Sequence, residues 1–347
     1  MPKAFITGAT GFVGGAVLRE LLQRRWDVRV LSRSTSDPRN LEGHPYPFEQ
    51  VDGDLRDKSS LRRAVQGCDT IFHVAARYSL WNPRPEEIYK DNVDGTRNLL
   101  EAAGDAGVGR IVYTSTVGVL KASKDGAPVD ESHLAELREI RGHYKRSKWL
   151  AEACARDLAQ KGLPIVIVNP STPVGPHDVK PTPTGRVIVD FLRRRMAAYT
   201  NTGLNLVSVE DVAVGHVLAA ERGETGKRYI LGAENYTLKR LLETLSSLTG
   251  LEPPRFCVPR RLLLPLAALS SGWTMLSRKN PFIPWEAARM AQKHMYFDST
   301  RARRELGFMP GDVVHALERA VRWFRENGYV GRLPARQAVV ERTSATP

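Results

Sequence analysis

The sequence of 347 residues predicts an α/β protein, with a doubly wound parallel sheet followed by a smaller, mostly helical C-terminal part. Two observations lead to this fold class. Short apolar runs alternate with segments of helical spacing through the first 170 residues, which is the pattern of strand–helix–strand units. A proline-rich stretch then interrupts the alternation, and helical patterns dominate afterwards.

The apolar runs of the first half are short and rich in Val and Ile, which is typical of strands buried on both faces of a parallel sheet. They lie at 4–6, 28–31, 70–74, 110–113 and 165–168. The intervening helical segments are 13–23, 60–65, 88–103 and 144–160.

A glycine-rich turn follows the first strand and opens the first helix. Its glycines have the spacing G-x-x-G-x-x-G, which allows a tight turn, a close approach of backbone to a pyrophosphate, and close packing of helix on strand. The helix N-terminus adds free N–H groups and a positive dipole end. We therefore expect a dinucleotide to contact Gly8, Thr10, Gly11, Phe12, Val13 and Gly14.

The second strand ends in Ser32-Arg33-Ser34. An NAD-selective site usually has an Asp or Glu here for the adenosine ribose, and this sequence has none. Arg33 suits a 2′-phosphate, which favours NADP(H), with NAD(H) as the alternative if Arg33 is simply an exposed arginine. After the third strand, Asp54 and Leu55 are candidates for contact with the adenine ring.

Tyr144 and Lys148 are four residues apart on one face of a predicted helix. A nearby ammonium favours the phenolate, so the pair is a candidate acid/base. A hydroxyl should join them from the end of a strand, and Thr114-Ser115-Thr116 follows the strand 110–113. Thr116 and Ser115 both remain candidates for the catalytic hydroxyl.

With these motifs in place, the chain resembles the extended short-chain dehydrogenase/reductases of the NAD-dependent epimerase/dehydratase type. The resemblance covers residues 3 to about 310. It is nearest to hopanoid-associated sugar epimerases, which are similar to dihydroflavonol 4-reductases. The segments that carry the nearer match are 78–81, 142–148 and 180–186.

The resemblance implies catalytic roles for Tyr144 as general acid/base, Lys148 as its partner and ribose ligand, and Thr116 as the donor to the substrate oxygen. It also implies further cofactor contacts from Val74, Ala75, Ala76, Asn92, Thr114, Ser115, Pro170 and Ser171. Epimerases of this type usually retain NAD, whereas the missing acidic residue fits a reductase with exchangeable NADPH. A dinucleotide-sensing protein without catalysis is a further alternative, although such proteins commonly lack the Tyr or the Lys.

The domain organisation follows from the same patterns. Residues 1–168 form the dinucleotide-binding Rossmann domain, to which about 204–231 return, residues 169–330 form the substrate-binding part, and 331–347 form a tail. Candidate substrate contacts are Tyr78, Trp81, Asn169, Lys180 and Arg186. Together these features predict hydride transfer at a secondary alcohol or ketone of a sugar-like or hopanoid-pathway substrate.

Composition narrows the partners. Three widely spaced cysteines indicate a reducing, cytoplasmic setting. No cluster of His, Cys, Asp or Glu has the spacing of metal ligands, so we expect no metal site.

Of the net charge of +13, residues 181–347 contribute +10, from 25 Lys/Arg against 15 Asp/Glu. No arginine–glycine repeat or basic stripe with aromatics points to nucleic acid. The apolar run 262–276 is too short to span a bilayer, but allows peripheral membrane contact at the inner face. Relatives also imply a homodimer through the helices 88–103 and 144–160.

Overall fold

The computed structural model describes residues 2–78, 84–123, 125–277 and 285–330, and it confirms the predicted doubly wound sheet. Among these residues the main sheet has seven strands in the order β10-β6-β5-β4-β1-β2-β3, with every neighbouring pair parallel. The strands are β1 Lys3–Thr7, β2 Asp27–Ser32, β3 Glu49–Asp52, β4 Thr70–His73, β5 Arg110–Thr114, β6 Ile165–Pro170 and β10 Arg228–Leu231. The carboxyl ends of β1, β4, β5 and β6 therefore meet at one edge of the sheet, where ligands bind in such folds.

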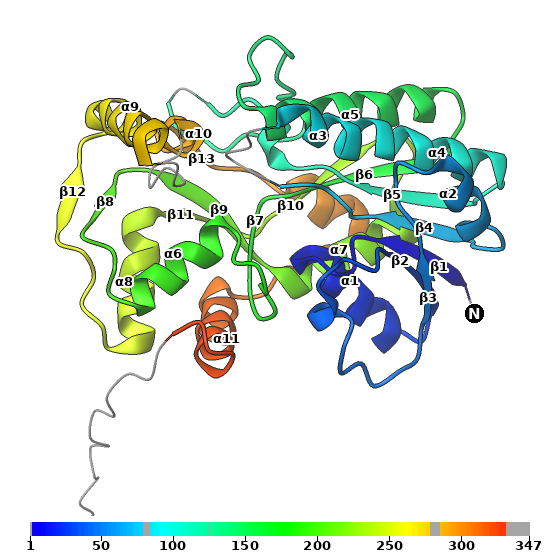
Figure 1. Ribbon diagram of the computed structural model, residues 1–347, viewed down its shortest axis with the longest axis horizontal. Coiled ribbons are helices and arrows are strands. Elements are labelled where there is room, and N and C mark those ends of the chain that lie inside the picture. Colours follow the sequence, from blue (N-terminus) through cyan, green and yellow to red (C-terminus); the bar gives the residue numbers. More distant parts are fainter. Residues whose placement is uncertain (1, 79–83, 124, 278–284, 331–347) are drawn as a thin grey trace, which may run out of the picture.

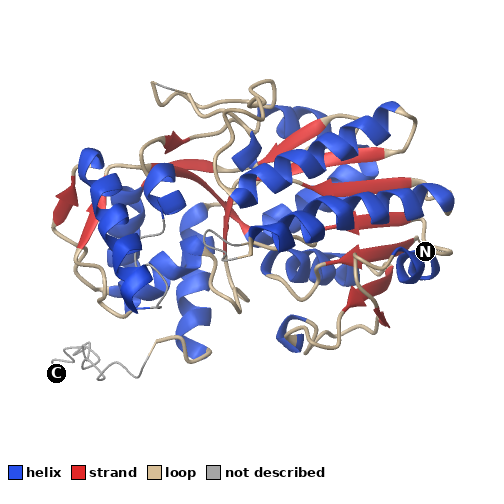
Figure 2. Ribbon diagram, turned by 45° about the horizontal axis from the view of Figure 1, so that its top comes forward, coloured by secondary structure: helices blue, strands red, loops and turns tan. Residues whose placement is uncertain are grey.

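Helices cover both faces of this sheet (Figure 2). One face packs on α1 (Phe12–Gln23) and α7 (Val209–Arg222), and the other packs on α2 (Lys58–Ala64), α4 (Gly95–Asp105) and α5 (His143–Gln160). Each side has its own apolar core, because the strands between them are buried on both faces.

The segment predicted as one helix, 88–103, consists of three helical pieces. They are α3 (Pro85–Tyr89), a π-helical turn (Lys90–Asp94) and α4. The π-turn buries Asn92, whose side chain bonds backbone outside the helix. A π-turn keeps the helix continuous, so apolar spacing alone does not reveal it.

The C-terminal part contains more strand than the sequence predicts. It lies beside the main sheet in Figure 1. One small sheet joins β7 (Thr172–Val174), β9 (Gly203–Ser208), β11 (Glu234–Thr237) and β13 (His294–Met295), and another joins β8 (Ala198–Thr200) and β12 (Phe256–Val258). Its helices are α6 (Pro183–Leu192), α8 (Leu238–Thr249), α9 (Arg260–Ser277), α10 (Trp285–Met290) and α11 (Val313–Glu326). Most of these strands are too short to show an alternating pattern.

The chain crosses between the two parts several times. After β9 it returns through α7, which packs on α1, and β10, which extends the main sheet beside β6. A π-helical turn at Ala302–Leu306 also packs into the core on the α1 side. Among the described residues, no helix is both long enough and apolar enough to cross a membrane.

Candidate active site

The glycine-rich turn is shaped so that side chains would not fit at two of its positions. Gly8 has a φ of +80°, and a Cβ there would lie 2.6 Å from the backbone nitrogen of Ala75. A Cβ on Gly14 would lie 2.1 Å from the carbonyl oxygen of Gly8. Gly11 is exposed and caps α1 without any side-chain hydrogen bond, which leaves the helix N-terminus open to an anion. These residues fit the pyrophosphate of a dinucleotide.

Asn40 supports this turn, and the sequence analysis missed it. Its buried side-chain amide donates hydrogen bonds to the carbonyl oxygens of Thr10 (3.2 Å) and Gly11 (3.3 Å). The contact spans about 30 residues of sequence, so no local pattern indicates it. Phe12 and Val13 follow at the start of α1, half-buried against the core.

At the end of β2, the Arg33 side chain reaches the loop after β3. Its Nη1 lies 3.9 Å from Oδ2 of Asp54, and about half of the side chain remains exposed. Ser32 is buried and accepts a hydrogen bond from Gln50 at 2.8 Å, whereas the Ser34 amide donates to Asp52 at 3.2 Å. Arg33 thus stands beside the predicted adenine contact Asp54, and it retains surface for a further anion. Leu55, next to Asp54, packs against Gly95 of α4.

Tyr144 and Lys148 lie in the first turns of α5, as the spacing predicts. The Lys148 ammonium is buried, donates to the carbonyl oxygen of Thr114 at 2.6 Å, and lies 4.6 Å from the ring centre of Tyr113. Burial lowers the pKa of Lys148 to about 7, and the charge of Glu152, one helical turn away, opposes that shift. The Thr114 hydroxyl is itself bonded to buried His216, at 2.8 Å.

The pKa of Tyr144 departs from the sequence-based expectation. Burial raises it above the usual value, where a neighbouring ammonium was expected to favour the phenolate. The ring is packed edge-on against Tyr78, with ring centroids 4.4 Å apart. Because burial raises this pKa, Tyr144 keeps its proton at neutral pH and is poised as a proton donor.

Two hydroxyls follow β5, and their surroundings differ. The Thr116 side chain is half-buried and its Oγ1 accepts a hydrogen bond from the Gly118 amide at 3.0 Å, which leaves its hydrogen to donate. Ser115 is buried, and its hydroxyl has no hydrogen-bond partner among the described residues. A donor to substrate must be reachable, so this geometry favours Thr116.

A buried polar network lies beneath Tyr144 and Thr116, and two of its members were not predicted. Asn169, at the end of β6, donates to the Thr116 carbonyl oxygen (3.0 Å) and to Oε2 of Glu152 (3.1 Å). The other oxygen of Glu152 pairs with Arg228 of β10 at 3.0 Å. Glu152 lies one turn beyond Lys148 on the same face of α5, which is a signal that the sequence does contain.

The remaining predicted contacts brace the site or line its edge. Asn92 accepts from the Arg77 amide (2.7 Å) and donates to the Ser147 hydroxyl (2.9 Å), which ties the loop after β4 to α5. Val74, Ala75, Ala76, Pro170 and Ser171 follow β4 or end β6 at the same edge of the sheet. Within that group, Ala75 lies directly under Gly8, and the Ser171 hydroxyl is buried without a partner among the described residues.

The predicted substrate contacts do not all meet at Tyr144. Tyr78 contacts Tyr144, Asn169 bonds the Thr116 backbone beside it, and Trp81 lies outside the described residues. Lys180 is exposed and lies near Asp37, in the loop after β2. The pKa of Asp37 is lowered to about 2, chiefly by a hydrogen bond from Arg39 and slightly by the charge of Lys180. Arg186 is exposed in the first turn of α6. Lys180 therefore lies on the adenosine side.

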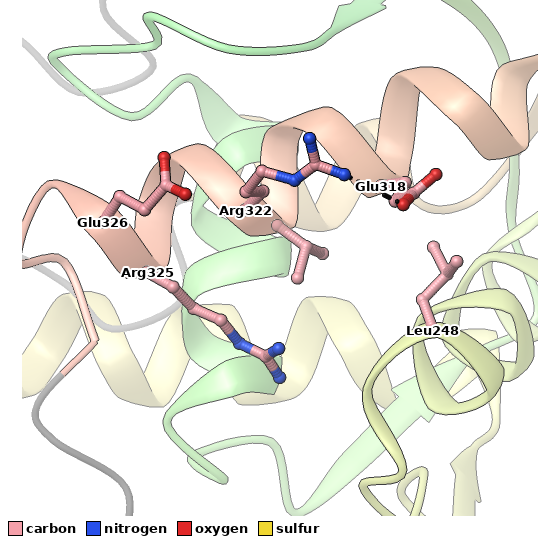
Figure 3. A pocket seen from close by; sticks show the side chains of 6 residues that line it. Leu248, Glu318, Arg322, Arg325 and Glu326 are labelled. Atoms are coloured by element: carbon pink, nitrogen blue, oxygen red, sulfur yellow. Dashed lines mark hydrogen bonds and ion pairs between the residues drawn. The ribbon is translucent and has the colours of Figure 1, made fainter.

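Two other features lie outside the catalytic set. His73 is held between the hydroxyls of Thr7 (2.8 Å) and Thr96 (2.9 Å), as a structural strand residue. In the described part of the chain no group of three metal-binding side chains forms. A shallow surface pocket between α8 and α11, lined by Leu248, Glu318, Val321, Arg322, Arg325 and Glu326, shares no residue with the site (Figure 3).

Comparison with known proteins agrees with this geometry. Residues 4–232 match the model of the NAD dependent epimerase/dehydratase family. The chain is 47% identical to a provisionally named dihydroflavonol 4-reductase of Synechocystis sp., over 94% of this chain and 95% of that protein. It is 36% identical to sterol demethylase protein B of Methylococcus capsulatus, over 94% of this chain and 99% of the relative. The crystal structure of gox2253 superposes with a TM-score of 0.85 at 44% identity, covering 95% of this chain and 100% of that one.

The similarities to known proteins and the geometry of the site, with its dinucleotide turn and its Tyr144–Lys148 pair, point to the same family. The chain belongs to the NAD dependent epimerase/dehydratase family and is an extended short-chain dehydrogenase/reductase, an enzyme of the oxidoreductase and epimerase type.

Proposed function

We propose that this enzyme uses NADPH to reduce a ketone to a secondary alcohol on a ring-bearing, sugar-like or hopanoid-type substrate. The observation that carries the proposal is Arg33, a half-exposed arginine at the end of β2 where an NAD-selective site would have a carboxylate. The reductase and sterol-related names of the relatives support the same direction.

The cofactor choice follows from charge. A 2′-phosphate beside Arg33 would gain a charge-assisted, bidentate contact that NADH cannot make. Asp54, 3.9 Å from Arg33, would hold the guanidinium at the adenosine end. The Gly8–Gly14 turn would hold the pyrophosphate, and Lys148 would hold the nicotinamide ribose.

The reaction uses the residues at the carboxyl edge of the sheet. A bound NADPH supplies the hydride that adds to the carbonyl carbon. Thr116 donates a hydrogen bond to the carbonyl oxygen as that oxygen gains charge. Tyr144, protonated at neutral pH, transfers its phenol proton to the same oxygen and completes the alcohol.

Lys148 and the network below it would then hold the phenolate until it takes up a proton from solvent. The ammonium of Lys148 stabilises the phenolate that Tyr144 leaves behind, and Glu152 keeps that ammonium charged. Asn169 fixes the backbone at Thr116, so that its hydroxyl and the phenol converge on one oxygen.

We propose that the Tyr78 ring lines the substrate-binding pocket. Its ring contacts Tyr144 edge-on and is nearly half exposed, at 46%. A flat apolar face of a cyclic substrate would pack on such a ring and exclude water from the phenol.

Purified enzyme incubated with NADPH and a panel of cyclic, aryl and open-chain ketones tests the proposal. We expect loss of NADPH absorbance in equal amount to alcohol formed, with cyclic ketones preferred. Interconversion of epimeric alcohols without net NADPH consumption would instead identify an epimerase. NADPH binding without turnover in either assay would favour the sensing role.

A further inference from the structure

Helix α9 has two apolar faces, and the residues that the structure describes cover only one of them. Leu263 and Ala267 are buried against Ala288 of α10. The residues at the outward positions are Arg261, Leu262, Pro265, Ala268 and Leu269, and all five are exposed. Their spacing of one, three, three and one residues places them on a single stripe of the helix. We refer to these five residues as the outer stripe.

Large exposed apolar side chains are frequent in the segment that carries the outer stripe. Leu262 is 46% exposed and Leu269 is 71% exposed. Phe256 of β12 is 74% exposed, and Trp285, which begins α10, is 43% exposed. Of the six large hydrophobic residues exposed in the described ranges, these four come from a stretch of 30 residues. Scattered exposed apolar residues are ordinary, but their concentration in one short segment points to an interaction surface.

The same region is strongly basic. Residues 253–297 contain seven Lys/Arg and one Asp/Glu, a net charge of +6. Arg261 on the outer stripe and Arg289 at the end of α10 are both exposed. An apolar stripe with arginine beside it and an aromatic residue nearby is typical of a helix that lies in a lipid interface.

The outer stripe is presented on a helix with a fixed N-terminal end. Nη2 of Arg260 lies 3.0 Å from His294 of β13, and its guanidinium also bonds the backbone carbonyl of Asn201. Gln292 donates to the Arg260 carbonyl oxygen at 2.8 Å. In Figure 1, α9 and α10 lie side by side in the upper left, in the C-terminal part, whereas the main sheet lies to the right. This position leaves the outer stripe free of the dinucleotide site.

We propose that the outer stripe, with Phe256 and Trp285, docks on an anionic lipid bilayer. The leucines enter the boundary between headgroups and acyl chains, and the arginines meet lipid phosphates. Charge decides against a second copy of this chain as the occupant, because two segments of charge +6 would then face each other. The enzyme would thereby work at a membrane surface, where an apolar cyclic substrate is concentrated.

Vesicle flotation of the full chain tests this proposal. The probes are vesicles of phosphatidylcholine alone and of phosphatidylcholine mixed with phosphatidylglycerol. We expect flotation with the anionic vesicles and weaker flotation with the neutral ones. High salt should lower flotation with the anionic vesicles toward the neutral level, because it screens the arginine–phosphate attraction, and should leave the neutral vesicles little changed. The double variant Leu262→Glu/Leu269→Glu should lower the vesicle-bound fraction at least about tenfold.

Met309→Glu is the matched control, because Met309 is 85% exposed, equally apolar, and outside this region. It should float as the wild type does, and circular dichroism should show both variants folded. Wild-type protein that stays unbound to anionic vesicles would overturn the proposal. So would a wild-type dimer, measured without lipid, that the double variant converts to monomer while flotation is unchanged.

Discussion

Arg33 and Asp54 meet across the carboxyl ends of β2 and β3, with Nη1 and Oδ2 3.9 Å apart. They are 21 positions apart in the sequence, and the parallel pairing of β2 with β3 brings their loops together. The pair places one positive and one negative group where the adenosine of a dinucleotide would lie.

Replacing Arg33 tests the cofactor choice. In Arg33→Ala we expect the Kd for NADPH to rise by about tenfold or more, because a charge-assisted contact to the 2′-phosphate is lost. The Kd for NADH should stay within about threefold, since NADH has no such phosphate. Fluorescence titration with each nucleotide measures both.

Arg62→Ala is the control, because Arg62 is an exposed arginine paired with Asp105 away from the site. It should bind both nucleotides as the wild type does. Equal losses of NADPH and NADH affinity in Arg33→Ala would show that Arg33 stabilises the loop and does not bind the 2′-phosphate.

Tyr144→Phe tests the proton donor. We expect kcat to fall by about 100-fold to 10,000-fold, as for loss of a general acid, with NADPH affinity within a few fold. Tyr46→Phe, on a ring packed under Arg25, should change neither value. Turnover of Tyr144→Phe at the wild-type rate would assign the proton to another group.

Glu152→Gln tests the positioning network through a pH profile. The negative charge of Glu152 raises the pKa of Lys148, which burial lowers to about 7. Removing that charge lowers the pKa further, so activity that needs the Lys148 ammonium should fall off at a lower pH than in the wild type. The measurement is kcat/KM against pH.

Glu131→Gln is the matched control for this profile. Glu131 is also buried, lies 3.6 Å from Arg301 and accepts a hydrogen bond from the Ile230 amide. Arg228 of the network bonds Glu131 only through its backbone carbonyl oxygen, which the substitution keeps. The variant should lose stability, since it removes the negative partner of the half-buried Arg301, yet it should keep the wild-type pH profile. Identical profiles for all three proteins would remove Glu152 from the positioning network.

His216 makes the fold acid-sensitive. Burial lowers its pKa to about 4, and its ring bonds the Val212 carbonyl and the Thr114 hydroxyl as a neutral group. Between pH ~6.5 and ~4 the unfolded chain binds a proton at this residue and the folded chain does not. The free energy of unfolding should therefore fall as pH decreases through this window, by up to about 3 kcal/mol from His216.

Urea unfolding of wild type and His216→Gln at pH 7.5 and pH 5 checks the sign. At the higher pH the variant should be the less stable protein, because it loses two buried hydrogen bonds. The difference in free energy of unfolding between the wild type and His216→Gln should be smaller at pH 5 than at pH 7.5. A gap that widens toward low pH would mean that His216 is protonated in the folded state.

The sequence revealed features whose cause is local. The Gly8–Gly14 turn and the Tyr144–Lys148 spacing each depend on residues within one turn or one helix, and the structure has them in that form. The buried strands could be predicted for the same reason, since a short run of Val and Ile is typical of a strand buried on both faces of a sheet.

Long-range contacts were beyond sequence reasoning. Asn40 bonds the turn from about 30 residues away, and Arg228 reaches Glu152 from a strand 76 residues later. The raised pKa of Tyr144 depends on burial, which helical spacing does not specify. The two-residue and three-residue strands of the C-terminal part were not predicted. Such short strands form because a partner strand pairs with them, and their own residues show no strand pattern.

The most direct test of the account is to identify the nucleotide carried by freshly purified protein, by mass analysis after denaturation, and then to titrate the emptied protein with NADPH and NADH. The account predicts an empty or readily exchanged site that binds NADPH more tightly than NADH. One tightly held NAD per chain would contradict it, because that is the state of an epimerase that returns its own hydride.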